Sequence, residues 1–201
     1  MKTRIAVLVS GGGTNLQALI DAQGSVIKSG EIVLVVSNTS KAYALERAKN
    51  ASIKAEVVVK KKSIPQAEFE EKLISVLEEN KIDLIVLAGF MTILSENFTS
   101  RYPERIINIH PSLIPSFCGE GFYGLKVHEA ALEYGVKVTG ATVHFVNEIP
   151  DGGRIIAQKA VSILPGDTPE ILQRRVMEEA EWILLPEATE KVSKEILESR
   201  K

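Results

Sequence analysis

The chain has 201 residues and a mass of 22.0 kDa, which suits one globular domain, and its 45% hydrophobic and 25% charged residues exclude a disordered chain. The 24 basic and 26 acidic residues give a net charge of −2, which argues against a nucleic-acid binder. One cysteine, Cys118, excludes an internal disulfide, and no apolar stretch approaches the ~20 residues of a membrane span, so we expect a cytoplasmic protein.

Apolar runs and helical patterns alternate through the first half of the chain. Five runs rich in β-branched residues predict strands at Ile5–Val9, Ile32–Val36, Ala55–Val59, Ile82–Leu87 and Ile106–Ile109. The segments between them predict helices over Asn15–Gln23, over Tyr43–Ala51, from Ser63 and Pro65 through Asn80, and from a capping Ser95 to about Tyr102. Continuous apolar strands that alternate with helices indicate a parallel sheet covered on both faces. Because the first predicted strand begins so close to the N-terminus, we expect no signal peptide.

The second half of the chain has a different pattern. Glycines and prolines predict a loop over Pro111–Gly124, followed by a helix over Lys126–Tyr134. Two strands joined by a turn are predicted at Val136–Val146 and Arg154–Val161, then a helix capped by Thr168 and kinked or restarted at Pro186. We therefore expect one α/β domain over residues 1–201: a Rossmann-like open sheet, mostly parallel with an antiparallel C-terminal portion, with helices on both faces.

A glycine loop, Ser10-Gly11-Gly12-Gly13-Thr14-Asn15, joins the first predicted strand to the first helix. Glycines allow the backbone to approach a ligand and a helix N-terminus offers unpaired N–H groups, so the loop predicts phosphate binding; a tight turn with nothing bound is the alternative. The loop lacks the Lys-Ser or Lys-Thr of a P-loop, and Leu16 stands where a dinucleotide fingerprint has its third glycine. The second strand ends at Ser37-Asn38, without an acid for a ribose. A small phosphorylated metabolite fits better.

Asn108 and His110 lie near the end of the fifth predicted strand, where open α/β sheets bind ligands. Alternation places both side chains on one face. An amide and an imidazole suit the polarisation of a carbonyl and the movement of a proton, although a capping Asn and a half-buried His explain the isolated pair equally well. The other histidines, His128 and His144, are expected to support the core or a loop. No metal site is expected, because the three histidines lack HxH and HxxxH spacing.

Asp151-Gly152-Gly153 follows the first of the two late strands. A carboxylate at this point is able to reach the rim of the sheet, although an Asp-Gly pair is most often a hairpin turn. The spacing alone does not place Asp151 beside His110.

Four blocks of sequence carry a resemblance to a known family. These are Ser10–Leu19, Leu87–Met91, Asn108–Leu113, and Gly140–Val146 with the following Asp151. In this order they closely resemble the phosphoribosylglycinamide formyltransferases, and they cover nearly the whole chain. The glycine loop alone is weak support, but the combination is highly specific.

The resemblance implies that a formyl group is transferred from the co-substrate 10-formyltetrahydrofolate to the amine of glycinamide ribonucleotide, in purine biosynthesis, without a metal. It implies that Asn108 and His110 stabilise the oxyanion of a tetrahedral intermediate. Asp151 would orient His110 and assist proton transfer from the attacking amine, through water. We expect small molecules as the only partners, apart from a second copy if the monomer forms a homodimer.

The resemblance also implies the binding residues. Those expected for glycinamide ribonucleotide are Gly13, Thr14, Asn15, Gly89, Pro111 and Glu181. Those expected for the folate are Gln66, Met91, Thr92, Ile93, Leu94, Asn108, Asn147 and Asp151. The family pattern places a phosphate-binding half in residues 1–105 and a catalytic and folate-binding half in residues 106–201.

The chain departs from the family pattern at a few positions. Gln66 stands where relatives often carry an arginine that contacts folate. Lys60-Lys61-Lys62, close by, either meets the glutamate tail of the folate or, as is more common for a charge run, is solvated. Arg154 replaces a proline common in the family, with no expected catalytic effect. Cys118 lies in the Pro111–Gly124 loop, a candidate mobile lid, and no catalytic role is expected for it.

Two related enzymes and two binding roles remain as alternatives. Formyltetrahydrofolate deformylase usually has an extra N-terminal domain, for which the early first strand leaves no room, and tends to have a histidine in place of Pro111. Methionyl-tRNA formyltransferase adds a C-terminal barrel and a basic surface, which do not match the length and the net charge of −2. The missing third glycine opposes a dinucleotide-binding module. The Asn108–His110 pair together with Asp151 opposes a non-catalytic ligand sensor.

Overall fold

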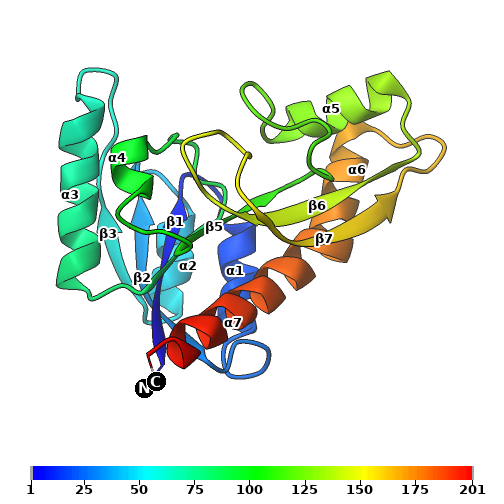
Figure 1. Cartoon of the computed structure of the whole chain (residues 1–201). Helices are drawn as coiled ribbons and strands as arrows, with labels where there is room; N and C mark the ends of the chain where they lie inside the picture. The colour runs from blue at the N-terminus through cyan, green and yellow to red at the C-terminus, as the bar shows by residue number, and fades with distance from the viewer. Residues whose placement is uncertain (1, 201) are drawn as a thin grey trace.

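The computed structural model describes residues 2–200 and contains one seven-stranded sheet in the order β3-β2-β1-β4-β5-β6-β7 (Figure 1). The first five strands run parallel, and β6 and β7 run antiparallel to their neighbours. Their bounds are β1 Thr3–Val9, β2 Gly30–Ser37, β3 Lys54–Val57, β4 Leu84–Leu87, β5 Ile106–His110, β6 Val138–Phe145 and β7 Ile155–Ser162. The predicted mostly parallel sheet with an antiparallel C-terminal portion is therefore confirmed.

Helices cover both faces of this sheet, as predicted. The bounds are α1 Thr14–Asp21, α2 Ala44–Asn50, α3 Gln66–Glu79, α4 Glu96–Thr99, α5 Leu125–Tyr134, α6 Pro169–Val176 and α7 Trp182–Glu198. Helices α1, α2, α6 and α7 pack on one face in one hydrophobic cluster. Helices α3 and α4 pack on the other face in a second cluster, and α5 lies against α6.

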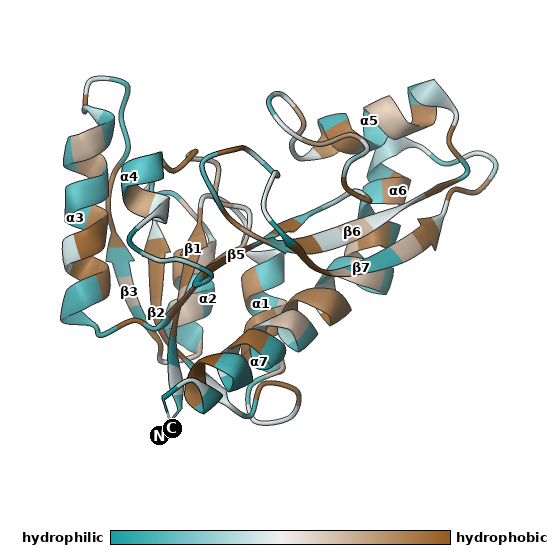
Figure 2. Ribbon diagram, viewed as in Figure 1, coloured by the Kyte–Doolittle hydropathy of each residue, from teal (hydrophilic) through white to brown (hydrophobic). Residues whose placement is uncertain are grey.

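Strand β1 shows why its sequence is a continuous apolar run. Ile5, Val7 and Val9 belong to the cluster on one face of the sheet, while Ala6 and Leu8 belong to the cluster on the other. All five side chains are fully buried, because a strand in the middle of a doubly covered sheet has no solvent side. Figure 2 shows the resulting brown strands between helices whose outer faces are teal.

The helix predicted from Ser95 is shorter than expected. Helix α4 ends at Thr99 rather than near Tyr102, and Ser95 makes no capping hydrogen bond. Instead, Ser95 Oγ donates to the carboxylate of Glu70 on α3 over 2.5 Å. The Ser95 hydroxyl therefore bonds to Glu70, a residue distant in sequence, and not to the helix N-terminus, as the local pattern predicted.

The C-terminal helix begins as predicted but changes form before Pro186. Thr168 Oγ1 accepts a hydrogen bond from the N–H of Ile171 over 3.3 Å, with Pro169 in the first turn. Residues Met177–Glu181 form a π-helical turn between α6 and α7, whereas Pro186 lies inside α7 without ending it. The predicted kink or restart at Pro186 is thus wrong in position, since the irregular turn precedes it. A π-helical turn holds one more residue than an α-helical turn, and such turns are frequent at functional sites.

The first and last described segments of the chain meet at Asp83. One carboxylate oxygen of Asp83 accepts the backbone N–H of Arg4 over 2.8 Å, and the other contacts the guanidinium of Arg200. Thr3 Oγ1 also donates to the carbonyl of Ser193 on α7 over 2.8 Å. No helix within residues 2–200 is long and apolar enough to cross a membrane.

Candidate active site

Strand β5 presents Asn108 and His110 on the same face of the sheet. Asn108 lies between Leu87 of β4 and His144 of β6, and His110 lies opposite Thr142. His110 is the last residue of the strand and is 4% exposed. The strand is therefore fixed on both sides, which leaves little freedom for either side chain.

Asp151 reaches His110 from the loop between β6 and β7. Its Oδ2 lies 3.4 Å from His110 Nδ1; the His110 side chain is buried and that of Asp151 is half-buried. The backbone of Asp151 is left-handed, with φ 54°. A Cβ at Gly153 would lie 1.7 Å from the carbonyl oxygen of Phe145, so only glycine allows the loop to pack so closely on the end of β6. The Asp-Gly-Gly segment thus positions a carboxylate rather than closing a simple hairpin turn.

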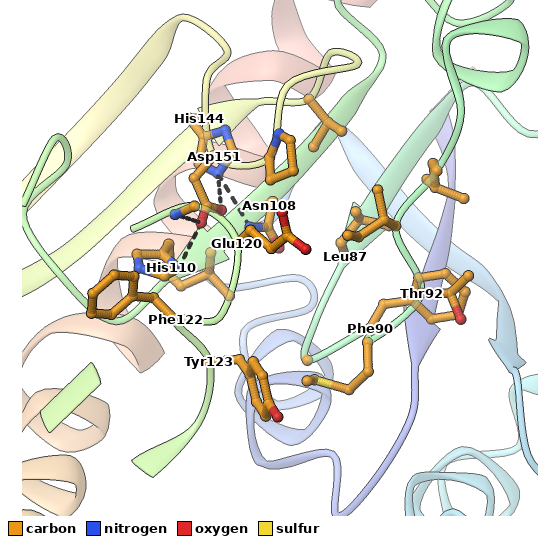
Figure 3. Close-up of a pocket in the computed structure, with 18 of the residues that line it drawn as sticks. Leu87, Phe90, Thr92, Asn108, His110, Glu120, Phe122, Tyr123, His144 and Asp151 are labelled. Atoms are coloured by element: carbon orange, nitrogen blue, oxygen red, sulfur yellow. Dashed lines mark hydrogen bonds and ion pairs between the residues drawn. The ribbon is translucent and has the colours of Figure 1, made fainter. Parts of the chain in front are cut away.

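His144 belongs to the same cluster, which the sequence interpretation missed. Its Nε2 lies 3.2 Å from Asn108 Nδ2 and 3.5 Å from Asp151 Oδ1 (Figure 3). Its Nδ1 lies 2.8 Å from the carbonyl oxygen of Phe145. The Nδ1–H tautomer satisfies both contacts, because Nδ1 then donates to the carbonyl and Nε2 accepts from the Asn108 amide. The expected role in supporting the core or a loop is corrected: His144 orients a site residue.

The Pro111–Gly124 loop covers this cluster with two backbone groups. His110 Nε2 lies 2.9 Å from the carbonyl oxygen of Phe117, which accepts its hydrogen bond. The N–H of Gly119 donates to Asp151 Oδ2 over 2.9 Å. Between them, Cys118 Sγ contacts the carbonyl oxygen of Pro115 over 3.3 Å, and burial raises the pKa of this thiol. The loop therefore fixes the two titratable groups, while Cys118 stays a thiol.

The two titratable groups are shifted in ways that suit proton transfer. Burial lowers the pKa of His110 below its ordinary value, although the charge of Asp151 and the Phe117 carbonyl oppose this. Burial raises the pKa of Asp151, but the neighbouring His144 imidazole, the charge of His110 and the Gly119 N–H together outweigh it, so the pKa is lowered overall. At neutral pH the pair is therefore an ionised carboxylate beside a neutral imidazole that is able to take up a proton.

A cavity of about 690 Å³ opens beside the cluster, as the labelled side chains in Figure 3 show. Its walls are the Gly89–Leu94 segment, the Gly119–Gly124 part of the loop and the turn that carries Asp151. The sequence-predicted site residues that line it are Gly89, Met91, Thr92, Ile93, Leu94, Asn108, His110, Pro111, Asn147 and Asp151. The size and the largely apolar walls suit a flat, drug-sized ligand.

A second group of predicted residues gathers at the N-terminus of α1, outside the lining of this cavity. Asn15 Nδ2 donates to Glu181 Oε2 over 2.6 Å, and Thr14 Oγ1 contacts Met177 Sδ over 3.8 Å. Glu181 is 6% exposed, and burial raises its pKa, opposed by the Asn15 hydrogen bond. The π-helical turn thus brings Glu181 against the first helix, although the two residues are far apart in the chain.

The glycine loop has a geometry that suits an anion. Gly13 has φ +72°, and a Cβ on it would lie 2.7 Å from the Cβ of Ala44 on α2. The N–H groups of Thr14, Asn15 and Leu16 donate to no backbone carbonyl within residues 2–200. Such free N–H groups at the start of a helix form an anion site. Gly13 is therefore also required for packing against α2, which the sequence did not indicate.

Three positions that depart from the family pattern lie outside the cavity lining. Gln66 Nε2 donates to the carbonyl oxygen of Ile93 over 3.0 Å and so lies behind the cavity wall. Lys60 Nζ donates to the carbonyl oxygen of Ile64 over 2.7 Å. Arg154 pairs with Glu104 over 2.7 Å and lies over the ring of Phe145. Among residues 2–200, no group of three or more His, Cys, Asp or Glu residues is arranged to hold a metal ion.

Comparison with known proteins decides the family. The sequence profile described as formyl transferase matches residues 3–189. The chain belongs to the formyl transferase family. The chain is 44% identical over 176 residues to the phosphoribosylglycinamide formyltransferase of Haemophilus influenzae, a match that covers 88% of this chain and 81% of the relative. It therefore groups with the phosphoribosylglycinamide formyltransferases, as the sequence blocks indicated.

Longer relatives and solved structures agree with this placement of the chain. It is 45% identical over 192 residues to the human trifunctional purine biosynthetic protein adenosine-3. That match covers 96% of this chain but only 18% of the relative, so the chain spans less than a fifth of that protein. The crystal structure of glycinamide ribonucleotide transformylase 1 from Symbiobacterium toebii is 41% identical with a TM-score of 0.89, covering 96% of this chain and 89% of that one.

Proposed function

We propose that this chain transfers the formyl group of 10-formyltetrahydrofolate to the amine of glycinamide ribonucleotide, giving formylglycinamide ribonucleotide in de novo purine biosynthesis. The observation that carries the proposal is the cluster of Asn108, His110, His144 and Asp151 at the side of the large cavity. An amide donor, a neutral imidazole and an ionised carboxylate are the groups that acyl transfer to an amine requires.

The reaction forms one bond and breaks another at the formyl carbon. The amine nitrogen attacks this carbon, and the electron pair of the C=O bond moves to oxygen. When the tetrahedral intermediate collapses, the bond from carbon to N10 of the folate breaks, and N10 receives a proton in place of the one lost by the amine. Preorganised donors aimed at the developing oxyanion contribute roughly 3–4 kcal/mol each to such a step.

Each member of the cluster has a distinct part in this scheme. One N–H of the Asn108 amide is taken by His144, which leaves the other for the oxyanion. His110 takes up a proton at Nδ1, because its Nε2–H donates to the Phe117 carbonyl, and the resulting positive charge stabilises the oxyanion. The carboxylate of Asp151 stabilises the resulting imidazolium at 3.4 Å and assists the passage of the amine proton through water.

The two substrates occupy neighbouring sites in this proposal. The phosphate of glycinamide ribonucleotide lies at the glycine loop, near Asn15 and Glu181, and the amine extends past Gly89 and Pro111 to the cluster. The pterin ring of the folate lies in the cavity between Met91–Leu94 and the turn that carries Asp151. A hydrogen bond from the N–H of Met91 to Ser10 Oγ, 2.9 Å long, joins the two sites.

An absorbance assay of 10-formyltetrahydrofolate tests the proposal. The expected result is loss of the formyl group only when glycinamide ribonucleotide is present, with one formylglycinamide ribonucleotide formed per donor consumed. Loss of the formyl group without an acceptor would identify a hydrolase of the deformylase type. Loss only with a charged methionyl-tRNA would identify the tRNA formyltransferase. Either result contradicts the proposal.

A further inference from the structure

The Met91–Leu94 segment forms one wall of the cavity although it belongs to no helix or strand. Met91 and Ile93 are 54% and 62% exposed, whereas Leu94 is buried in the core cluster under α3. Two large apolar side chains are thus held beside the cavity without cover from the rest of the chain. The hydrophobic effect favours burial of such side chains, so contacts elsewhere in the structure must hold the backbone of this segment in place.

Side chains from other elements hold the first part of this wall. Ser10, at the end of β1, accepts the N–H of Met91 over 2.9 Å. Asn38, just after β2, donates its amide to Thr92 Oγ1 over 2.9 Å. These two bonds fix one end of the wall to the rim of the sheet.

A buried carboxylate holds the second part. Glu70 on α3 is 4% exposed and accepts three hydrogen bonds. The N–H of Ser95 donates over 2.7 Å, Ser95 Oγ over 2.5 Å and Gln66 Nε2 over 2.7 Å. The other N–H of the same Gln66 amide donates to the carbonyl oxygen of Ile93. Glu70 therefore fixes the chain at Ile93 and Ser95, on both sides of the buried Leu94.

We propose that Glu70 is a positioning residue for the formyl donor, because through Gln66 and Ser95 it holds the Met91–Leu94 wall open before the donor binds. The inference rests on the proposed function, which assigns the donor to this cavity. Glu70 itself does not line the cavity. We call the hydrogen bonds of Glu70 to Gln66 and Ser95 the brace. Because the wall is already ordered, binding of the donor does not include the entropic cost of ordering it. The brace therefore contributes to donor affinity and not to the chemical step.

Glu70→Gln keeps the shape of this side chain but removes its charge. The amide oxygen still accepts from the Ser95 N–H and from Gln66, and the NH₂ group donates to Ser95 Oγ, because a hydroxyl accepts as well as donates. Three charge-assisted hydrogen bonds thus become neutral ones, which are about half as strong, so the substitution weakens the brace without creating a cavity. We expect a rise of about tenfold in KM for 10-formyltetrahydrofolate, which corresponds to about 1.4 kcal/mol. The KM for glycinamide ribonucleotide and kcat should stay within about twofold, since neither depends on this wall.

A neighbouring glutamate offers a matched control. Glu71 is exposed on the same helix and makes no hydrogen bond or ion pair among the described residues, so Glu71→Gln makes the same change of charge with no brace to break. Ser95→Ala removes only the hydroxyl donor and keeps the Ser95 N–H contact, and it serves as the milder variant should Glu70→Gln fold poorly. We expect Ser95→Ala to raise the donor KM about threefold.

The experiment measures both KM values, tetrahydrofolate binding by calorimetry, and amide hydrogen exchange of residues 88–97 without ligand. Support requires a higher donor KM, weaker tetrahydrofolate binding and faster exchange in Glu70→Gln, with Glu71→Gln like the wild type. An unchanged donor KM in both Glu70→Gln and Ser95→Ala, or an equal rise for both substrates, overturns the inference. If the wild type binds tetrahydrofolate but fails to formylate glycinamide ribonucleotide, the proposed function is wrong. The binding and exchange measurements then still test whether Glu70 positions the Met91–Leu94 segment. If the wild type binds no tetrahydrofolate, both the proposed function and the role of Glu70 are wrong.

Discussion

The Asn108 side chain must serve two acceptors at once. His144 Nε2 takes one of its amide hydrogens at 3.2 Å, and the other is directed to the reacting oxygen in the proposed reaction. An aspartate of the same shape would offer no hydrogen, and an alanine would leave His144 Nε2 without its donor. The chemistry at this position therefore depends on the residue type and not only on the shape of the side chain.

Replacing either residue should reduce turnover without unfolding the chain. Asn108→Ala and His110→Ala are each expected to lower kcat for formyl transfer about a hundredfold or more, because the first removes an amide donor to the oxyanion and the second removes the positive charge that stabilises it. Steady-state kinetics measures the effect, and circular dichroism checks that the helices are retained. Near-normal rates in both variants would contradict the roles assigned to them.

The sequence predicts the chemistry of some site residues better than that of others. Asn108, His110 and Asp151 come together as expected, and the structure places the last two 3.4 Å apart. His144 could not be distinguished from a core residue, since it lies in a strand whose neighbours are all buried. The brace at Glu70 depends on Ser95 from a distant segment, which no local pattern reveals.

At the scale of elements, the β1–α1 loop serves packing as well as binding. Gly13 has a positive φ and lies against Ala44 of α2, whereas Gly11 has open space around it. The N–H of Ala44 donates to the carbonyl oxygen of Gly11 over 3.1 Å, and Arg47 Nε donates to that of Gly12 over 2.8 Å. Helix α2 thus holds the loop in the shape that leaves its N–H groups free.

This difference between the glycines is testable by stability. Gly13→Ala should lower the free energy of unfolding by roughly 1–3 kcal/mol, because it combines a left-handed backbone with a contact of 2.7 Å. At 2–4 °C per kcal/mol, the melting temperature should fall by several degrees. Gly11→Ala is the control, and its melting temperature should change by no more than about 2 °C. Equal melting temperatures for the two variants would show that α2 does not constrain the loop.

The irregular elements mark where local patterns mislead. The sequence predicts a kink or restart at Pro186, whereas α7 runs through Pro186 and the irregular turn lies earlier, at Met177–Glu181. Beyond Thr99, the end of α4, the backbone tightens into turns, in which the N–H of Arg101 donates to the carbonyl of Phe98 and that of Tyr102 to the carbonyl of Thr99. Element types follow from periodicity, whereas their ends depend on contacts with distant residues.

For the whole molecule, the sequence predicts the class of sheet but not its strand order. Apolar runs alternating with helices require parallel neighbours, and the turn between Phe145 and Ile155 requires an antiparallel pair. The pairing of β1 with both β2 and β4 is a feature that the sequence pattern does not predict. The cavity beside β5 depends on this order, which brings β4, β5 and β6 together.

The free energy of unfolding should depend on pH through His128, a histidine that has no part in the proposed reaction. His128 on α5 is 1% exposed, and neither ring nitrogen has a hydrogen-bond partner among residues 2–200. Burial, with a smaller effect from His110, lowers its pKa from 6.5 to about 4. Between these values the unfolded chain binds a proton that the folded chain does not, so the free energy of unfolding falls as the pH decreases below 6.5.

Thermal unfolding at pH 7.5 and pH 5 measures this dependence. At pH 5 the contribution of His128 is about 2 kcal/mol, or roughly 4–8 °C in melting temperature. His128→Phe should therefore lose less stability on acidification than the wild type does. If both proteins lose the same number of degrees, the buried imidazole is not the cause of the acid sensitivity.

One carboxylate, Asp83, binds residues near both ends of the described chain, Arg4 and Arg200. A fold whose first strand and last helix meet at one point can be inserted between other domains without stretching its connections. The same closeness would let a short peptide join the two ends and open the chain elsewhere, so circular permutants cut in an exposed loop should still assemble the complete sheet.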